Sequence, residues 1–266
     1  MADQALDPAI QVLPGTDVED LWDRFEVFEA LHHSMQICNP MRSSHLDELI
    51  DVMALDDGDH VLDVGSGYGE LLIRGAQSNE IIGTGIDLSP WMVTAACTEA
   101  RSRVPDADLT WVLGEAKEFT TAIPPQVCVC IGAEWVWHGL SGTASALARR
   151  VAPGGMVVLG AARLHLGADQ AKVRSEHGYV DTVDDVAVLL DHNQLDVEHR
   201  IDPSDDDWDA YLERTRQAAG EWAQRGSSRA QEWVDEQHDW HLARERDRNI
   251  IGWSVWVARK RHNVDG

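Results

Sequence analysis

The sequence contains few lysines, few cysteines and no long uninterrupted apolar run. Only Lys117, Lys172 and Lys260 are lysines among 22 basic residues, which face 46 acidic residues and leave a formal net charge of −24. No apolar run approaches the length of a membrane span. The first ten residues, MADQALDPAI, have neither the basic nor the apolar part of a secretion signal. We therefore expect a cytoplasmic protein with no membrane partner.

The acidic balance argues against nucleic acid as a partner. Affinity for DNA or RNA depends mainly on the neutralisation of phosphates by lysine and arginine. The sequence has only short basic groups, such as Arg259, Lys260 and Arg261 near its C-terminus. We expect a small-molecule partner instead, and a monomer or homodimer.

The most informative stretch is DHVLDVGSGYGE, at residues 59–70. Its apolar part, 61–64, suits a buried strand, and helix-forming residues follow the loop. Glycine permits positive φ and lets a ligand approach the backbone. The loop N–H groups and the helix N-terminus therefore face the same ligand. The loop glycines alternate with other residues: they are Gly65, Gly67 and Gly69.

Two ligands fit such a loop. Dinucleotide enzymes place G-x-G-x-x-G at this point to seat a pyrophosphate on the helix. Here the pattern is G-S-G-Y-G, and Glu70 begins the helix where it would repel a pyrophosphate. A second apolar run, 81–87, ends in Asp87, a carboxylate placed to accept both hydroxyls of a ribose. Asp87 suits NAD and S-adenosylmethionine equally well.

Three later motifs favour the second ligand. They are LTWVLGEA at 109–116, VCVCIGAEWVW at 127–137 and RRVAPGGMVVLG at 149–160. Together with the glycine loop and Asp87, they resemble the ordered motifs of class I S-adenosylmethionine-dependent methyltransferases. The resemblance implies an α/β fold with a Rossmann-like seven-stranded sheet, mostly parallel with an antiparallel last strand, and helices on both faces.

The resemblance also implies S-adenosylmethionine as the cofactor. Asp87 would bind the ribose, and Glu115 of the Gly-Glu-Ala motif would receive the adenine amino group, although either could simply end a strand or face water. We expect Asp63 to brace the loop through backbone hydrogen bonds, and Met92 to lie under the adenine or in the core. The expected cofactor-binding residues are Asp63, Gly65, Ser66, Gly67, Asp87, Leu88, Met92, Glu115, Ala116, Ile131 and Gly132.

The remaining sequence predicts a cap and an insertion around this core. Residues 1–55 hold two predicted helices and form an N-terminal cap, while 56–202 and 250–262 form the core. Residues 203–249 are rich in tryptophan, lack strand signals and form a helical insertion or lid.

Tryptophans in the insertion recur at helical spacing. Trp208 and Trp222 are fourteen apart, and Trp233 and Trp240 are seven apart, so each pair lies on one helical face. We expect the insertion and the N-terminal helices to cover the cleft and to supply the acceptor pocket. The alternative is that these rings fill a helix-to-sheet interface.

Residues after the fourth predicted strand are expected to face the methyl acceptor. The reaction needs exclusion of water, alignment of the acceptor and often removal of a proton. Glu134 and His138 are the candidate bases, although a loop histidine is often only a polar surface residue. Other expected acceptor contacts are His33, Trp135, Trp137, His238 and His241, and further candidate pocket residues are His32 and Asn39. The alternative for His32, His33 and Asn39 is that they cap helices and face water.

We expect no metal. His238 and His241 share a helical face but have no third ligand at a suitable spacing. The four cysteines also lack metal-ligand spacing. Cys128 and Cys130 alternate along a predicted strand, where we expect buried free thiols.

The sequence thus predicts an enzyme that transfers a methyl group from S-adenosylmethionine to oxygen, nitrogen or another nucleophile of a small molecule. One alternative is an NAD-linked dehydrogenase, which needs a fingerprint that Gly69 and Glu70 do not supply. The other alternative is a non-catalytic S-adenosylmethionine-binding protein, or one that uses the nucleotide for another reaction.

Overall fold

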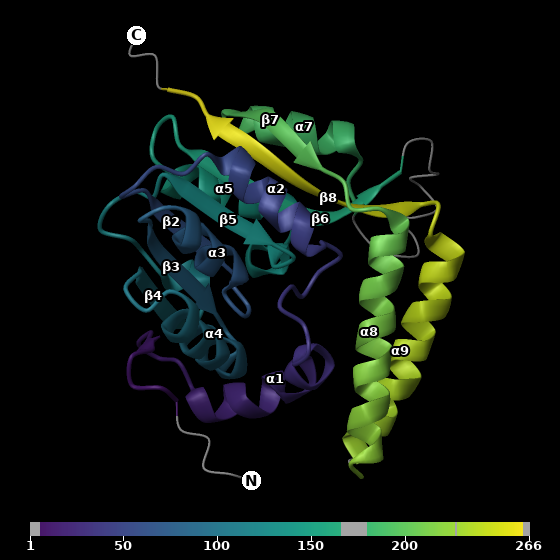
Figure 1. The fold of residues 1–266 in the computed structure, drawn as a ribbon. Coiled ribbons are helices and arrows are strands. Elements are labelled where there is room, and N and C mark those ends of the chain that lie inside the picture. Colours follow the sequence, from purple (N-terminus) through teal and green to yellow (C-terminus); the bar gives the residue numbers. More distant parts are fainter. Residues whose placement is uncertain (1–5, 166–179, 227, 263–266) are drawn as a thin grey trace.

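An eight-stranded sheet forms the centre of the molecule in the computed structural model, which describes residues 6–165, 180–226 and 228–262 (Figure 1). The strand order is β1-β4-β3-β2-β5-β6-β8-β7. The strands are β1 (Gln11–Val12), β2 (His60–Val64), β3 (Ile82–Asp87), β4 (Asp108–Leu113), β5 (Val127–Ile131), β6 (Met156–Leu164), β7 (Leu195–Ile201) and β8 (Ile251–Lys260). Neighbours from β1 to β6 pair in parallel, and β8 pairs antiparallel with both β6 and β7.

The predicted Rossmann-like fold with an antiparallel last strand is confirmed. The structure adds one strand to the seven expected, because Gln11 and Val12 pair with Val112 and Leu113 at the edge of the sheet. Two residues are too few to show the alternation by which a strand is recognised in a sequence.

Helices cover both faces of the sheet. One face carries α2 (Ser43–Met53), α3 (Glu70–Ser78) and α4 (Pro90–Arg103), and the other carries α5 (Leu140–Arg150) and α7 (Val183–His192). Each face has its own buried apolar cluster, and successive side chains of β8 alternate between the two clusters as strand geometry requires. Trp253, Val255 and Val257 belong to the first cluster, and Trp256 and Ala258 to the second.

Polar caps fix where several helices begin. Asp17 accepts a hydrogen bond from the Asp20 N–H at the start of α1 (Val18–His32). Ser89 does the same for the Met92 N–H, and Pro90 occupies the first turn of α4. These caps satisfy N–H groups that have no partner inside the helix. The cap at Ser89 lies two residues beyond the end of β3, so α4 starts directly after it, at Pro90.

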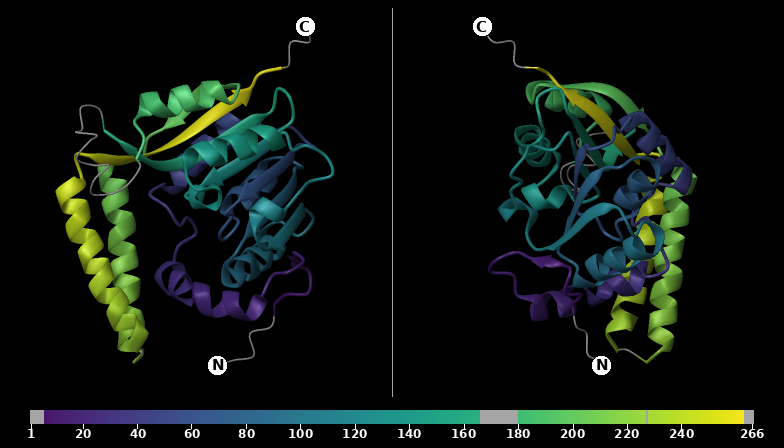
Figure 2. Two further views of the ribbon diagram at one scale, coloured as in Figure 1. Left: turned by 180° about the vertical axis from the view of Figure 1, so that it is seen from behind. Right: turned by 60° about the vertical axis from the view of Figure 1, so that its left-hand side comes forward.

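The predicted insertion is a helical hairpin between β7 and β8. Its helices, α8 (Asp205–Gln224) and α9 (Ser228–Asp247), run side by side and project away from the sheet (Figure 2). The side chains of residues 228, 229, 236–241, 243 and 244 lie outside the described structure. No helix of the described residues is both long and apolar enough to cross a membrane.

Tryptophans of the hairpin fill interfaces. Trp208 meets Trp253 of β8 edge-on, with ring centroids 5.9 Å apart. Trp222 and Trp233 pack around a small cluster in which Ala219 of α8 meets α1. These contacts match the alternative reading of the tryptophan spacing. The side chain of Trp240 lies outside the described part of α9.

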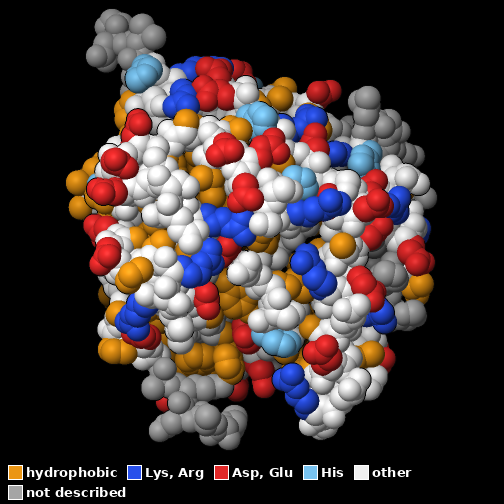
Figure 3. Space-filling model, in the orientation of Figure 1, with side chains coloured by type: hydrophobic (Ala, Val, Ile, Leu, Met, Phe, Trp, Pro, Cys, Tyr) orange, Lys and Arg blue, Asp and Glu red, His pale blue; other side chains and the backbone are white. Residues whose placement is uncertain are grey.

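Charges of both signs are interspersed on the face shown in Figure 3, where hydrophobic side chains gather in the lower central part, near α1. At the C-terminal basic run, Arg259 pairs with Glu198, and Arg261 pairs with Asp191 and Asp196. Neighbouring carboxylates therefore neutralise much of the basic run.

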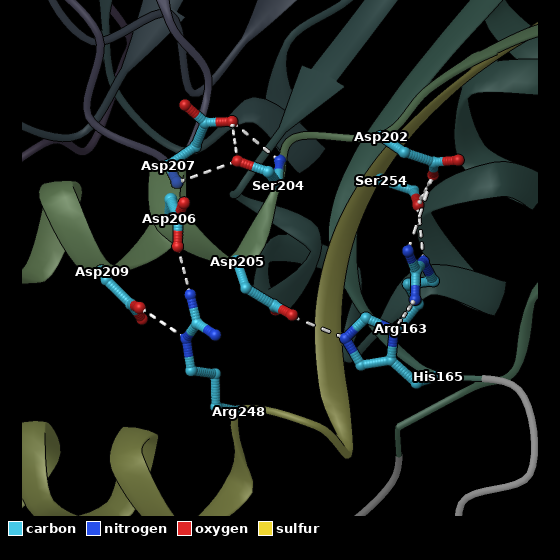
Figure 4. Close-up of polar contacts among 10 residues, drawn as sticks. All are labelled: Arg163, His165, Asp202, Ser204, Asp205, Asp206, Asp207, Asp209, Arg248 and Ser254. Atoms are coloured by element: carbon cyan, nitrogen blue, oxygen red, sulfur yellow. Dashed lines mark hydrogen bonds and ion pairs between the residues drawn. The ribbon is translucent and has the colours of Figure 1, made fainter.

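A polar junction joins the base of the hairpin to the sheet (Figure 4). Arg163 Nε of β6 donates to Ser254 Oγ of β8 at 2.8 Å. His165 Nε2 lies 3.4 Å from Asp205 Oδ1, at the first residue of α8. The other side chains of this junction are Asp202, Ser204, Asp206, Asp207, Asp209 and Arg248.

Further along the hairpin, α8 holds α1 in place. The buried His32 ring bonds to the Phe28 carbonyl oxygen through Nδ1 at 2.7 Å and to the Tyr211 hydroxyl through Nε2 at 2.9 Å. Because a carbonyl can only accept, Nδ1 carries the proton and Nε2 accepts from Tyr211. Burial lowers the pKa of His32 to about 4, with a further contribution from the charge of Arg214. His32 is therefore neutral in the folded protein.

We expect His32 to make the protein sensitive to acid. Its pKa falls from 6.5 to about 4 on folding, so the stability it contributes is complete above pH 6.5 and is lost as the pH falls towards 4. Urea unfolding should show a weaker pH dependence for His32→Gln than for the wild type, by on the order of 2 kcal/mol across this window. His33→Gln, at the exposed neighbouring residue, is the control. An identical pH profile for wild type and His32→Gln would contradict this account.

Candidate functional site

A cavity of ≈ 340 Å³ opens at the carboxyl ends of β2, β3 and β5. Ligands of open α/β sheets bind at this edge, where the strand order reverses. The cavity is lined partly by the loops that follow the strands and partly by the chain that precedes β2. The residues from that preceding part are Phe25, Phe28, Gln36, Ile37, Cys38, Asn39, Met41 and Leu46.

The glycine loop has the backbone conformation that its sequence predicts. Gly65, Gly67 and Gly69 have φ of 70°, 53° and 73°, in the left-handed region that side chains disfavour. A Cβ at Gly65 would lie 2.4 Å from Ala133 Cβ, and one at Gly69 would lie 2.2 Å from Trp111 Cη2. Two of these positions therefore need glycine for space as well as for φ.

Asp87, at the end of β3, holds the glycine loop through hydrogen bonds. Its carboxylate accepts the N–H of Gly67 at 2.9 Å and the N–H of Ser89 at 2.8 Å. Burial raises the pKa of Asp87, while these backbone hydrogen bonds act in the opposite direction. Asp87 thus performs the bracing that we expected of Asp63.

Asp63 lines the cavity with no hydrogen-bond partner for its carboxylate among the described residues. Burial, and then the charge of Asp87, raise its pKa to about 7. Ser66 Oγ is also buried, and it has no partner within the described structure. Buried polar groups are normally hydrogen-bonded, so these two groups are available to a ligand.

Glu70 differs from Asp63 because two arginines compensate its charge. Arg74 Nε lies 2.5 Å from Glu70 Oε1, and Arg103 Nη1 lies 2.5 Å from Oε2. Burial acts to raise the pKa of Glu70, but the two arginines lower it overall. The i,i+4 spacing of Glu70 and Arg74 is visible in the sequence, whereas the contact with Arg103 depends on the packing of α3 against α4.

Most of the expected cofactor-binding residues line the cavity. They are Asp63, Gly65, Ser66, Gly67, Asp87, Leu88, Met92, Ala116, Ile131 and Gly132, and Trp135 of the expected acceptor set joins them. Glu115 is next to Ala116 but outside the lining. Its side chain is 40% exposed, with Oε2 3.8 Å from Lys117 Nζ.

Several expected acceptor residues do not line the cavity. Glu134 and Trp137 lie on a short 3₁₀ helix (Glu134–Trp137), which turns their side chains away. Glu134 is half-buried, and burial raises its pKa. Trp137 packs under Arg150, whose Cζ is 5.0 Å from the ring centroid. His138 is exposed at the end of this helix, with φ of 61°.

The expected histidine contacts are also not brought together. His33 is exposed at the end of α1, where its Nδ1 bonds to the Ala30 carbonyl oxygen at 3.0 Å. His32 packs against Tyr211 instead of lining the cavity. The side chains of His238 and His241 lie outside the described residues. Asn39, by contrast, does line the cavity.

Aromatic residues of α1 line the cavity, and the sequence did not predict them as site residues. The apolar residues of α1 divide into two sets, because Leu21 and Leu31 are buried while Phe25 and Phe28 line the cavity. Tyr68 also lines the cavity, and its role was not anticipated from a position between two loop glycines.

The hairpin packs against α1, which lines the cavity, but does not contribute to the lining itself. No described residue of α8 or α9 lines the cavity. The hairpin packs behind α1 instead, with Ala219 against Val27 and Leu31. This arrangement differs from the expectation that the insertion supplies the acceptor pocket.

Comparisons with known proteins agree with this geometry. The methyltransferase domain family matches residues 61–155. A S-adenosylmethionine-dependent methyltransferase from Geobacter sulfurreducens, solved with S-adenosyl-L-homocysteine, superposes with a TM-score of 0.79 at 26% identity, covering 89% of this chain and 98% of that one. The chain has the class I methyltransferase fold. A methyltransferase from Thiobacillus denitrificans, also solved with S-adenosyl-L-homocysteine, shares this fold at a TM-score of 0.76 and 26% identity, over 88% of this chain and 98% of that one.

A curated relative supports the same conclusion over a shorter region. The uncharacterised protein YjhP of Escherichia coli (strain K12) is 30% identical over 136 residues, which are 51% of this chain and 54% of that protein. The matched region of this methyltransferase fold therefore spans about half the length of that relative.

We expect Asp63→Asn to stabilise the ligand-free protein at neutral and higher pH. Folding raises the pKa of Asp63 from 3.8 to about 7, so wild-type stability falls as the pH rises through this window. The gain from Asp63→Asn should be near zero at about pH 4 and on the order of 2 to 4 kcal/mol at about pH 8. Denaturant melts at both pH values measure it, with Asp108→Asn, an exposed residue of β4, as the control. Equal stability of Asp63→Asn and wild type at the higher pH would contradict the account in which the Asp63 carboxylate has no partner in the folded protein.

Proposed function

We propose that this protein transfers a methyl group from S-adenosylmethionine to a small-molecule acceptor. The observation that carries the proposal is the pair Asp63 and Asp87 at the ends of adjacent parallel strands, facing one cavity next to the glycine loop. The match of residues 61–155 to the methyltransferase domain, and the relatives solved with S-adenosyl-L-homocysteine, support the same ligand.

The cavity fits this cofactor in charge and in unsatisfied groups. S-adenosylmethionine carries a sulfonium and an ammonium group, and an unpartnered buried carboxylate favours a cation. Asp63 would accept hydrogen bonds from the ammonium group, and Ser66 Oγ would gain the hydrogen-bond partner that it lacks. Asp87 would receive the ribose hydroxyls with the lone pairs that Gly67 and Ser89 leave free. Glu115 at the rim would reach the adenine amino group, above Met92.

The cofactor supplies a methyl group on a positively charged sulfur, which needs no further activation. The protein must therefore hold the acceptor in line and exclude water. The aromatic wall of α1 and the segment 36–41 cover the strand ends and serve this purpose. Trp135, which is 53% exposed, extends the wall on the β5 side.

A small acceptor fits a cavity of this size and lining better than a polymer does. No lysine, arginine or histidine is among its described lining residues. A nucleic acid would need a basic surface to approach, and carboxylates compensate the basic run at 259–261. The proposal includes a cytoplasmic monomer or homodimer, organised as a cap (1–55), a core (56–202 and 250–262) and an insertion (203–249).

Cofactor binding should depend on Asp87. We expect titration calorimetry with S-adenosyl-L-homocysteine to show a loss of about 1.5 to 3 kcal/mol for Asp87→Ala, the scale for hydrogen bonds to a charged group. Asp108→Ala removes an exposed aspartate from β4 and should bind like the wild type. Unchanged affinity in Asp87→Ala would exclude this cavity as the cofactor site.

Turnover distinguishes methyl transfer from simple binding of the nucleotide. We expect the protein to release S-adenosyl-L-homocysteine from S-adenosylmethionine when dialysable cell metabolites are added, because the cavity admits small molecules. Transfer RNA and DNA are the controls and should give no release. Release with nucleic acid alone would refute the small-molecule acceptor. Tight cofactor binding without release from any of these pools would favour a binding protein.

A further inference from the structure

The wall that α1 presents to the cavity is aromatic. Phe25, Phe28 and Tyr68 all line the cavity, and Phe28 is 39% exposed. Phe25 and Phe28 lie three residues apart on α1, so they share one helical face with Glu29, which is four residues from Phe25. Arg24 Cζ already lies 5.5 Å from the Phe25 ring centroid, and the Phe28 ring is stacked on His32 at 4.1 Å. The rings therefore offer a ligand only their remaining faces and edges, which favour apolar groups and, on a ring face, cations.

Tyr68 connects this wall to the glycine loop. Its backbone lies between Gly67 and Gly69, and its hydroxyl donates to Glu29 Oε2 at 2.6 Å. A phenol has one proton to donate but can also accept. Because Glu29 takes the proton, the Tyr68 oxygen is left as a hydrogen-bond acceptor for a ligand. Glu29 is itself outside the lining and acts through Tyr68.

The charges around Tyr68 are mainly negative. Burial and then Glu29 raise the pKa of Tyr68, and Asp87 adds to this effect. Burial, Asp87 and Glu29 likewise raise the pKa of the Cys38 thiol, where Arg214 is the opposing cation. Two neighbouring groups therefore respond to the same pair of carboxylates. Such a site favours a cation over an anion of the same size.

We propose that the space between Tyr68 and α1 binds the methyl acceptor, and that this acceptor is an amine with an apolar or aromatic body, which enters as an ammonium cation. An N–H of the cation would donate to the Tyr68 oxygen, and Phe25 and Phe28 would pack on its body. For transfer, the ammonium group would lose this proton to the Tyr68 oxygen while Tyr68 passes its own proton to Glu29. The freed nitrogen lone pair would then take the methyl group, and the cofactor sulfur would leave as the neutral thioether. The inference rests on the proposed function, because the cofactor is assigned to the end of the cavity that holds Asp63 and Asp87.

Three probes of matched shape test the charge preference. Phenethylamine, phenethyl alcohol and hydrocinnamate are titrated by calorimetry into the full chain saturated with S-adenosyl-L-homocysteine. We expect the amine to bind roughly tenfold more tightly than the alcohol, and hydrocinnamate to bind most weakly. Binding of the alcohol or of hydrocinnamate as tightly as the amine overturns the proposal, as does the absence of amine binding.

Variants identify the residues responsible. Tyr68→Phe keeps the ring and Glu29→Gln keeps the shape, and each should lower the amine-to-alcohol affinity ratio about fivefold, whereas Glu29→Asp should restore part of it. Glu19→Gln removes the same charge from an exposed position of α1 and should leave the ratio as in the wild type. Thermal melts check that each variant is folded.

The amine-to-alcohol affinity ratio separates a role in recognition from a general loss of structure, because a structural defect weakens the binding of both probes together. An unchanged ratio in both Tyr68→Phe and Glu29→Gln overturns the assignment. Failure of the wild type to bind S-adenosyl-L-homocysteine at the first step overturns the proposed function instead, so the two failures are distinguishable.

Discussion

The site depends on one buried carboxylate that two backbone segments share. Asp87 accepts N–H groups from Gly67 in the loop after β2 and from Ser89 at the start of α4. These bonds hold the loop against β3 and set where α4 begins, so the floor of the cavity follows from them. They also keep a negative charge buried beside Asp63, whose pKa is raised first by burial and then by that charge. The electrostatic character of the cavity is therefore a result of how the loop is held.

Two buried carboxylates near the cavity differ in whether a cation compensates their charge. Glu70 is enclosed by Arg74 and Arg103 and contributes to the packing of α3 against α4. Asp63 has no such cation, so its ionised form lowers the stability of the ligand-free fold. A cationic ligand would offset that cost on binding. Stability and ligand affinity are thus opposed at Asp63, as is common at functional sites.

Local sequence was enough to predict the parts of the fold that use neighbouring residues. The strand, loop and helix around Gly65, Gly67 and Gly69 follow from backbone sterics within twelve residues. The two-residue strand β1 could not be predicted, because it is defined only by its pairing with Val112 and Leu113. The bond between Tyr68 and Glu29 could not be predicted either, since it joins residues 39 apart whose meeting depends on where α1 docks.

The contacts between α8 and α1 connect the hairpin to one wall of the cavity. Phe25 and Phe28 form a wall of the cavity, while Val27 and Leu31 of the same helix pack against the hairpin. His32, whose ring is stacked on Phe28, accepts the hydrogen bond from Tyr211 of α8. Moving α1 outward breaks that bond and exposes the apolar contacts beneath it. The cost of moving α1 away from the cavity therefore includes its contacts with α8, a helix with no described residue in the cavity lining. Contacts on the outer side of α1 thus contribute to holding the wall of the cavity in place.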